Sequence, residues 1–182
     1  MTLTAEMHSN INLIKQKINT TTRSTFTGNI SFQPTTMWFV TLMGNRQSMA
    51  NDAVNDTNKI GFSTLMLGTN QMFMFDQGSI LQNITLTYIF QGSGDDSPLR
   101  SGTKSTIHSV NLSGAMPVLP EITLSPSVGI VSSKVGQFDP IVTQTYGISA
   151  QHRAFENKLT TTLSENASFV SGTKSIRTGL SS

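Results

Sequence analysis

The feature that most constrains the fold is a regular alternation of apolar and neutral polar residues. From Phe26 to Phe32, every second residue is Phe, Gly or Ile, and Thr, Asn and Ser lie between them. From Ile80 to Phe90 the alternation returns, broken by Gln82, with Asn and Thr at several intervening positions. Because successive side chains of a strand point to opposite faces, each segment predicts a strand with one apolar and one polar face.

Turn-forming residues divide the chain into about eight short segments of this kind. Gly and Asn at 44–45 and 68–70, and Asp and Gly at 76–78, predict turns between strands. Prolines concentrated between residues 116 and 126 predict edge strands or an extended segment that crosses the sheet surface. The pattern therefore indicates antiparallel strands joined by short connections.

The fold class that follows is mainly β, with a single antiparallel β domain. Residues 36–43 are apolar on both faces, which predicts a central strand with Trp38 as a core anchor. Residues 138–148 are the last expected strand. A sandwich, a jelly roll and a curved sheet are all compatible with this number of strands.

Two helices are expected to flank the β domain, an N-terminal amphipathic helix over Leu3–Ile18 and a C-terminal helix over Ala150–Leu163. Their apolar residues recur at spacings of three or four, which match one face of a helix. These residues are Leu3, Met7, Ile11, Ile14 and Ile18 at the start and Phe155, Leu159 and Leu163 at the end. The expected organisation is a helix and linker over 1–24, the β domain with its C-terminal helix over 25–163, and a flexible tail over 164–182.

Charge is scarce along the whole chain. Charged residues make up 12% of the sequence, against roughly 25% in an ordinary soluble domain. Ser, Thr, Asn and Gln take their place, and a surface made of hydroxyls and amides is cheaper to desolvate than one made of ions. The composition resembles that of virion structural subunits, whose surfaces favour Thr, Ser and Asn over charge.

The residues that usually carry catalysis or bind metals do not form a recognisable constellation. The chain has no cysteine, which excludes disulfides, thiol nucleophiles and thiolate metal sites. His8, His108 and His152 lie far apart, and the pair Asp95-Asp96 is followed by Ser-Pro in a polar segment, which favours a solvated turn. We therefore expect no enzyme activity, no cofactor and no bound metal.

Basic residues occur in pairs rather than in a long basic run. Lys15 and Lys17 near the start, and Lys174 and Arg177 near the end, are the candidates for weak contact with nucleic acid or an anionic membrane. The first residues lack the features of a secretory signal. No apolar run approaches the ~20 residues that span a bilayer as a helix. These observations predict synthesis in a cytoplasm.

Together the patterns favour a structural role. The leading expectation is a self-assembling structural subunit of a virus or phage particle, either a coat (capsid) or a matrix protein, found in the virion and in the host cytoplasm during synthesis. Its main partner would be further copies of itself, as a homo-oligomer, and no small-molecule substrate is expected. The alternative is a β-sandwich binding module that recognises a glycan or a protein through loops such as Gln91–Lys104.

Overall fold

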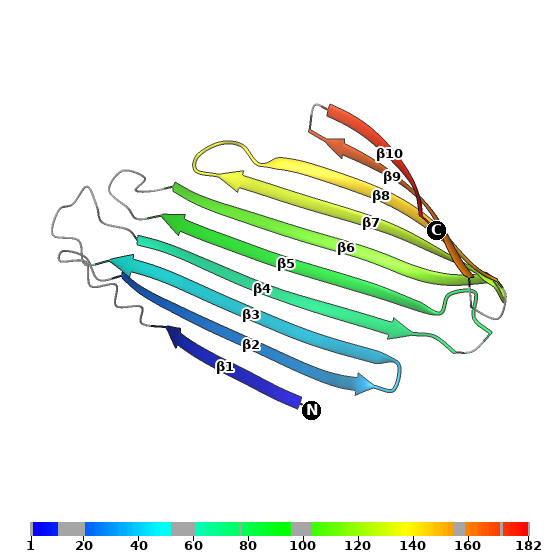
Figure 1. Ribbon diagram of the computed structural model, residues 1–182, viewed down its shortest axis with the longest axis horizontal. Coiled ribbons are helices and arrows are strands. Elements are labelled where there is room, and N and C mark those ends of the chain that lie inside the picture. Colours follow the sequence, from blue (N-terminus) through cyan, green and yellow to red (C-terminus); the bar gives the residue numbers. More distant parts are fainter. Residues whose placement is uncertain are drawn as a thin grey trace.

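The structure, a computed structural model, describes residues 2–10, 21–51, 61–76, 78–95, 103–154, 159–171 and 173–181. These residues form one ten-stranded antiparallel sheet in which each strand pairs with the next along the chain (Figure 1). The strands are β1 (Thr2–Asn10), β2 (Thr21–Thr35), β3 (Trp38–Asn51), β4 (Gly61–Met74), β5 (Asn83–Asp95), β6 (Thr103–Leu119), β7 (Ile122–Val135), β8 (Ile141–Ala154), β9 (Leu159–Val170) and β10 (Thr173–Ser181).

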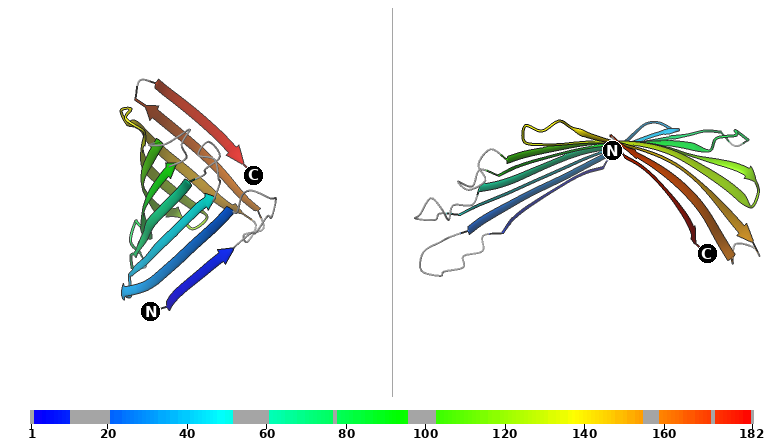
Figure 2. Two further views of the ribbon diagram at one scale, coloured as in Figure 1. Left: turned by 90° about the vertical axis from the view of Figure 1, so that its left-hand side faces the viewer. Right: turned by 90° about the horizontal axis from the view of Figure 1, so that it is seen from above.

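The sheet is a single open layer. Strands β1 and β10 form its two edges, and the sheet twists so that β9 and β10 turn out of the plane of the central strands (Figure 2). Among the described residues, Val40 is the one hydrophobic residue that is buried, and 6% of its surface is exposed. A second layer is what normally buries the apolar face of a sheet, so this sheet lacks a core of ordinary size within the described residues.

The mainly β, antiparallel class predicted from the sequence is confirmed, and the described residues form one sheet rather than a sandwich. The expected domain limits after residues 24 and 163 fall inside β2 and β9.

The two predicted terminal helices are not found where the structure describes the chain. Strand β1 occupies Thr2–Asn10, and residues 11–20 of the predicted Leu3–Ile18 helix lie outside the described residues. Strands β8 and β9 occupy most of Ala150–Leu163, with 155–158 outside the described residues. A spacing of four residues is even, so it places residues on one face of a strand as well as on one face of a helix. The Thr160-Thr161-Thr162 run in β9 then favours the strand, because β-branched side chains are restricted in a helix.

Some residues taken as turn signals lie inside long strands. Gly68 sits in the middle of β4 opposite Met43 of β3. A Cβ at Gly68 would lie 2.9 Å from Met43 Cγ, so this glycine makes room for a neighbouring side chain. The positive-φ glycines of the described residues are Gly78 and Gly136, and both lie in connections. The turn predicted near residues 76–78 lies in the connection between β4 and β5. A backbone hydrogen bond from Ser79 N to Asp76 O closes it.

Prolines also lie within strands of the sheet interior. Pro117 belongs to β6 and Pro126 to β7, and neither strand is at an edge. The β6–β7 pairing is interrupted between Ser113–Ser127 and Met116–Leu124, where Pro126 lies, without a change of register, and the register shifts after Pro117. Because proline has no N–H to donate to the ladder, it is tolerated at such interruptions. The prediction that these prolines mark edge strands or a segment crossing the sheet surface is therefore wrong, because Pro117 and Pro126 belong to interior strands.

Substitutions at Val40 and Val128 measure how differently the two side chains are buried. Both lie on the same cross-strand row, but Val40 is 6% exposed and Val128 41%. We expect Val40→Ala to lower the free energy of unfolding by about 2 kcal/mol and Val128→Ala by less than about 1 kcal/mol, measured by urea unfolding. Equal losses would mean that a partner covers Val128 in solution.

Candidate functional site

The register of the strands sorts the side chains onto two faces. Cross-strand partners in an antiparallel sheet lie on the same face, so a face can be followed from strand to strand. One such row contains, in order, Phe32, Val40, Gln71, Leu86, Leu112, Val128 and Tyr146. We call the face that carries this row the apolar face, and the opposite one the polar face.

The apolar face leaves large hydrophobic side chains in the open. Side chains on six different strands of this face, from β2 to β8, are between 41% and 50% exposed: Phe26, Leu42, Leu67, Leu112, Ile130 and Ile148. Single exposed hydrophobic residues are ordinary, but a continuous apolar surface of this breadth marks a binding surface. The apolar face is therefore the principal candidate functional site.

The polar face carries several neutral cross-strand pairs that bond to one another, beside apolar side chains such as Met43 and Met72 on β3 and β4. Asn45 Nδ2 donates to Thr27 Oγ1 at 3.2 Å, and Asn70 Nδ2 donates to Thr87 Oγ1 at 3.1 Å. The hydroxyls of Ser93 and Ser105 lie 2.8 Å apart, and those of Ser31 and Thr41 lie 3.1 Å apart. Each pair joins directly opposed residues on neighbouring strands. These pairs stabilise the register and leave spare acceptor sites for water or for another polar surface.

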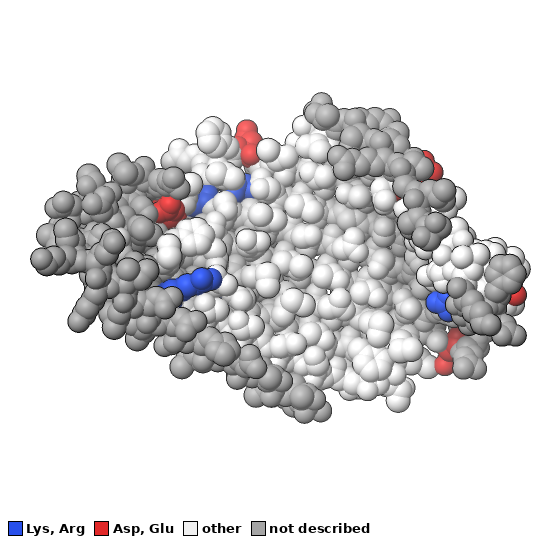
Figure 3. Space-filling model, in the orientation of Figure 1, with Lys and Arg blue, Asp and Glu red and all other residues white. Residues whose placement is uncertain are grey.

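On β2 to β8 most charged residues lie toward the ends of the strands, whereas Glu6, Glu165 and Arg177 are central positions of β1, β9 and β10. Figure 3 shows a broad central area without Lys, Arg, Asp or Glu. By register, Arg46, Lys104 and Lys134 belong to the apolar face at the same end of the sheet, and all three are exposed. We call these three residues the cationic border. Within the described strands, no acidic residue shares that end of the apolar face.

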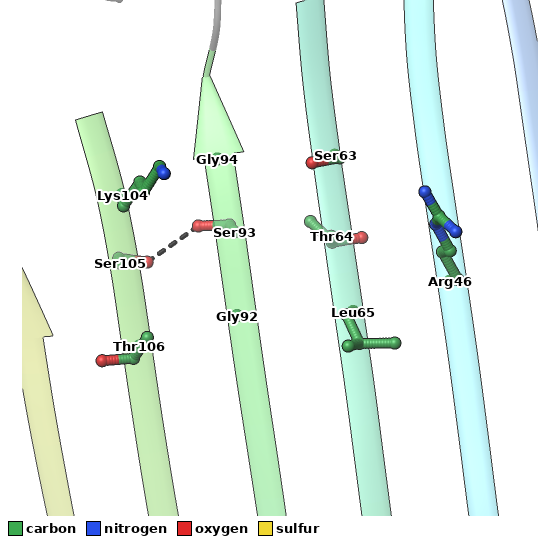
Figure 4. A pocket seen from close by; sticks show the side chains of 10 residues that line it. All are labelled: Arg46, Ser63, Thr64, Leu65, Gly92, Ser93, Gly94, Lys104, Ser105 and Thr106. Atoms are coloured by element: carbon green, nitrogen blue, oxygen red, sulfur yellow. Dashed lines mark hydrogen bonds between the residues drawn. The ribbon is translucent and has the colours of Figure 1, made fainter. Parts of the chain in front are cut away.

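A shallow hollow of about 340 Å³ lies within the cationic border (Figure 4). Gly92 and Gly94 of β5 provide no side chains there, and Arg46 on β3 and Lys104 on β6 stand on either side. Strands β3 and β6 are three strand spacings apart, about 14 Å at roughly 4.8 Å each. The two cations are thus too far apart to clamp one phosphate, but they are spaced to contact several separate anionic groups.

The basic residues selected from the sequence are not brought together with this border. Lys15 and Lys17 lie outside the described residues. Lys174 and Arg177 are positions of β10, paired with Phe169 and Asn166 of β9. Positions three residues apart on a strand belong to opposite faces, and β10 is separated from β6 by three strands.

Arg46, Lys104 and Lys134 were missed because they come from three distant segments. In the sequence, each of these residues is an even number of positions away from the apolar residues of its own strand, which predicts the apolar face for it. Grouping the three residues also requires the order and register in which the strands pair.

The histidines do not form a site among themselves. His108 of β6 lies 3.0 Å from the Tyr88 hydroxyl through Nδ1 and packs against the Phe90 ring, with centroids 5.1 Å apart. His8 and His152 belong to β1 and β8. In the described part of the chain, no group of three or more His, Cys, Asp or Glu is placed to hold a metal ion. Nor does that part contain a helix long and apolar enough to cross a membrane.

Comparisons of the chain with protein-family models, curated proteins and solved structures found no match.

The neutral cross-strand pairs can be tested at the Asn70–Thr87 pair, which is partly buried. In a double-mutant cycle of Asn70→Ala and Thr87→Val, we expect a coupling free energy of about 0.5 to 1 kcal/mol, typical of a neutral hydrogen bond. The measurement is urea unfolding of the four proteins. Strict additivity of the two single changes would contradict the hydrogen bond.

Proposed function

We propose that this chain is a self-assembling structural subunit, of the coat or matrix type that builds virus and phage particles. The observation that carries the proposal is the open, single-layer sheet, which leaves two strand edges and a broad apolar face to be covered. Further copies of the chain are the partner that the sheet edges fit best.

The edges support assembly through the backbone. In the described part of the chain, β1 and β10 each pair with a neighbour on one side only. An edge strand presents a row of N–H and C=O groups that another strand can pair with. Edge-to-edge contact would thus continue the sheet from one copy to the next.

The charges of the edge strands favour pairing of unlike edges. By sequence, β1 carries Glu6, and β10 carries Lys174 and Arg177. Opposite charges on facing strands are favourable and like charges are unfavourable. We therefore propose that β1 of one copy meets β10 of the next, which gives a head-to-tail contact that repeats.

Low charge supports the same proposal. Copies that carry few ions repel one another weakly and lose little free energy when their surfaces are desolvated. The coat and matrix versions differ in their second partner, nucleic acid or an anionic membrane, for which Lys15, Lys17, Lys174 and Arg177 remain the proposed contacts.

The alternative of a β-sandwich module relied on two packed sheets and on the Gln91–Lys104 loop. The described residues form one sheet, and residues 96–102 of that loop lie outside them.

Assembly should depend little on salt. Contacts made by backbone groups, hydroxyls and apolar side chains are not screened by ions, and screening of the edge charges should raise the concentration needed for assembly by no more than about fivefold, so particles should persist from about 0.05 to 1 M salt. Light scattering over this range is the measurement. A monomer at every salt and protein concentration would refute self-assembly.

The proposed edge contact predicts a charge-swap result. Glu6→Lys makes both edges cationic, and we expect the concentration needed for assembly to rise about two- to fivefold, from 0.2–1 kcal/mol for each opposed pair. Adding Arg177→Glu, at the position of β10 that shares the polar face with Glu6 by register, restores opposite signs and should restore assembly. Gln137→Lys, in the exposed connection between β7 and β8, adds the same charge elsewhere and should have no effect. Equal effects of Glu6→Lys and Gln137→Lys would exclude the β1–β10 contact.

A further inference from the structure

We propose that the apolar face contacts the hydrocarbon of a lipid bilayer, with the cationic border at the level of anionic lipid headgroups. The inference rests on the proposed function in one respect, because it requires partner strands for the edges of the sheet. It also names the chemistry of the partner that covers the apolar face.

The length of the apolar surface fits the bilayer. On β2, β5 and β6 the apolar stretch covers seven residues, or six residue-to-residue steps, from Phe26 to Phe32, Ile84 to Phe90 and Val110 to Met116, and on β8 it covers nine residues, or eight steps, from Val142 to Ala150. At roughly 3.4 Å per residue these stretches are about 20 to 27 Å long. The apolar band of strands that cross a membrane is about 25 Å tall, and strands tilted by about 45° need roughly 9 to 11 residues to cross it, so these stretches match the band where the strands run close to the bilayer normal.

On β4 and β8 the polar residues of this band are neutral amides and hydroxyls, whereas on β9 Glu165 lies opposite Ile148 on the same face. Thr69, Gln71 and Gln144 lie on the apolar face among the hydrophobic rows, and Gln144 Oε1 accepts a hydrogen bond from the Tyr146 hydroxyl at 3.3 Å. A neutral group costs far less in hydrocarbon than an ion does. On β2 to β8, the central rows of this face carry no Lys, Arg, Asp or Glu within the described residues.

The two ends of the band carry the residue types found at membrane interfaces. Arg46, Lys104 and Lys134 lie at one end, where each cation can contact an anionic headgroup. Trp38 lies at the other end, at the start of β3, stacked on Phe73 with ring centroids 5.5 Å apart. Tryptophan is enriched where hydrocarbon meets headgroups. A second copy packed on the apolar face accounts for the hydrophobic rows, but it gives no reason for the cations at one border.

The rest of the sheet must then be kept from hydrocarbon. The hydroxyls and amides of the polar face require water or the polar face of a neighbouring copy. The edge strands require partner strands, since hydrocarbon offers no hydrogen bonds to an open sheet edge. Pairing of β1 with β10 between copies supplies those partners.

Trp38, the single tryptophan, reports on lipid contact. The probe is a vesicle of phosphatidylcholine and phosphatidylglycerol whose acyl chains carry bromine, a quencher of tryptophan fluorescence. We expect the full chain to show a blue shift and quenching, strongest with bromine near the carbonyl end of the acyl chains, because Trp38 lies at the border of the band. Absence of quenching at every bromine depth would overturn the proposal.

A pair of neighbouring residues supplies a matched control for the face. Leu112 is 46% exposed on the apolar face, and Asn111 is exposed on the polar face of the same strand. We expect Leu112→Asp to weaken vesicle binding at least tenfold and Asn111→Asp to leave it within about twofold, since an ion at the bilayer centre costs about 2.5–3.5 kcal/mol. Circular dichroism checks that both variants keep the sheet, and Leu112→Asn provides a milder change if Leu112→Asp fails to fold. Equal binding by the Leu112 and Asn111 variants would refute contact through the apolar face.

The cationic border has its own test. Replacing Arg46, Lys104 and Lys134 with Gln should lower affinity for anionic vesicles about fivefold for each residue and leave neutral vesicles unaffected. Arg23→Gln removes a cation from the same end of the sheet but from the polar face, where Arg23 contacts Gln47, and should have little effect. An equal loss in the Arg23 variant would exclude a specific border.

The two proposals can fail separately. Particles that form without lipid quenching would reject the membrane contact and keep self-assembly. Trp38 emission that shifts with protein concentration alone, without lipid, would indicate a second copy on the apolar face. Lipid quenching by a chain that stays monomeric in vesicles, shown by cross-linking, would reject assembly and the edge pairing, and would leave the apolar-face contact only with both sheet edges in water.

Discussion

Cross-strand register determines which side chains of this sheet share a face. Phe32, Leu86 and Tyr146 are far apart in the sequence, yet they occupy one row because β2 to β8 pair in order and without a change of parity along that row. A slip of one residue in any strand would carry its apolar side chains to the polar face. The hydrogen-bonded pairs of the polar face, such as Asn45 with Thr27, oppose such a slip. The apolar face exists as a continuous surface because the polar face fixes the register.

A single layer has a further consequence for stability. Long strands form many backbone hydrogen bonds, but each contributes only about 0.5–1.5 kcal/mol net, and fixing one residue costs about 1–2 kcal/mol in conformational entropy. Burial of apolar side chains normally offsets that cost, and in the described residues it is confined to Val40 and to partly covered neighbours. The sheet therefore gains its stability together with whatever covers the apolar face and the edges. Folding and binding are expected to be coupled in this protein.

The sequence predicted the strands better than it predicted their limits. The alternation at residues 80–90 identified β5 correctly, because period two over many residues has no helical equivalent. The four-residue spacing of Phe155, Leu159 and Leu163 suggested a helix and is equally consistent with the strand observed at Leu159–Val170. Gly68 was taken for a turn, since the sequence does not show that Met43 lies opposite it. The cationic border required the same missing information, because Arg46, Lys104 and Lys134 come to the same end of the apolar face only once five strands, β3 to β7, are paired in register.

The scarcity of charge follows from the two faces. An ion on the apolar face would have to be desolvated against hydrocarbon or a partner, and an ion on the polar face would displace one of the neutral cross-strand pairs. On β2 to β8 the charged residues accordingly lie toward strand ends: Arg23, Arg46, Asp95, Lys104, Lys134 and Arg153. Long strands leave few such positions, so a chain made mostly of long two-faced strands can hold only a small charged fraction. The 12% of charged residues is thus consistent with long two-faced strands. On β2 to β8 the ionic contacts lie toward the strand ends, while on the outer strands β1, β9 and β10 Glu6, Glu165 and Arg177 are central positions.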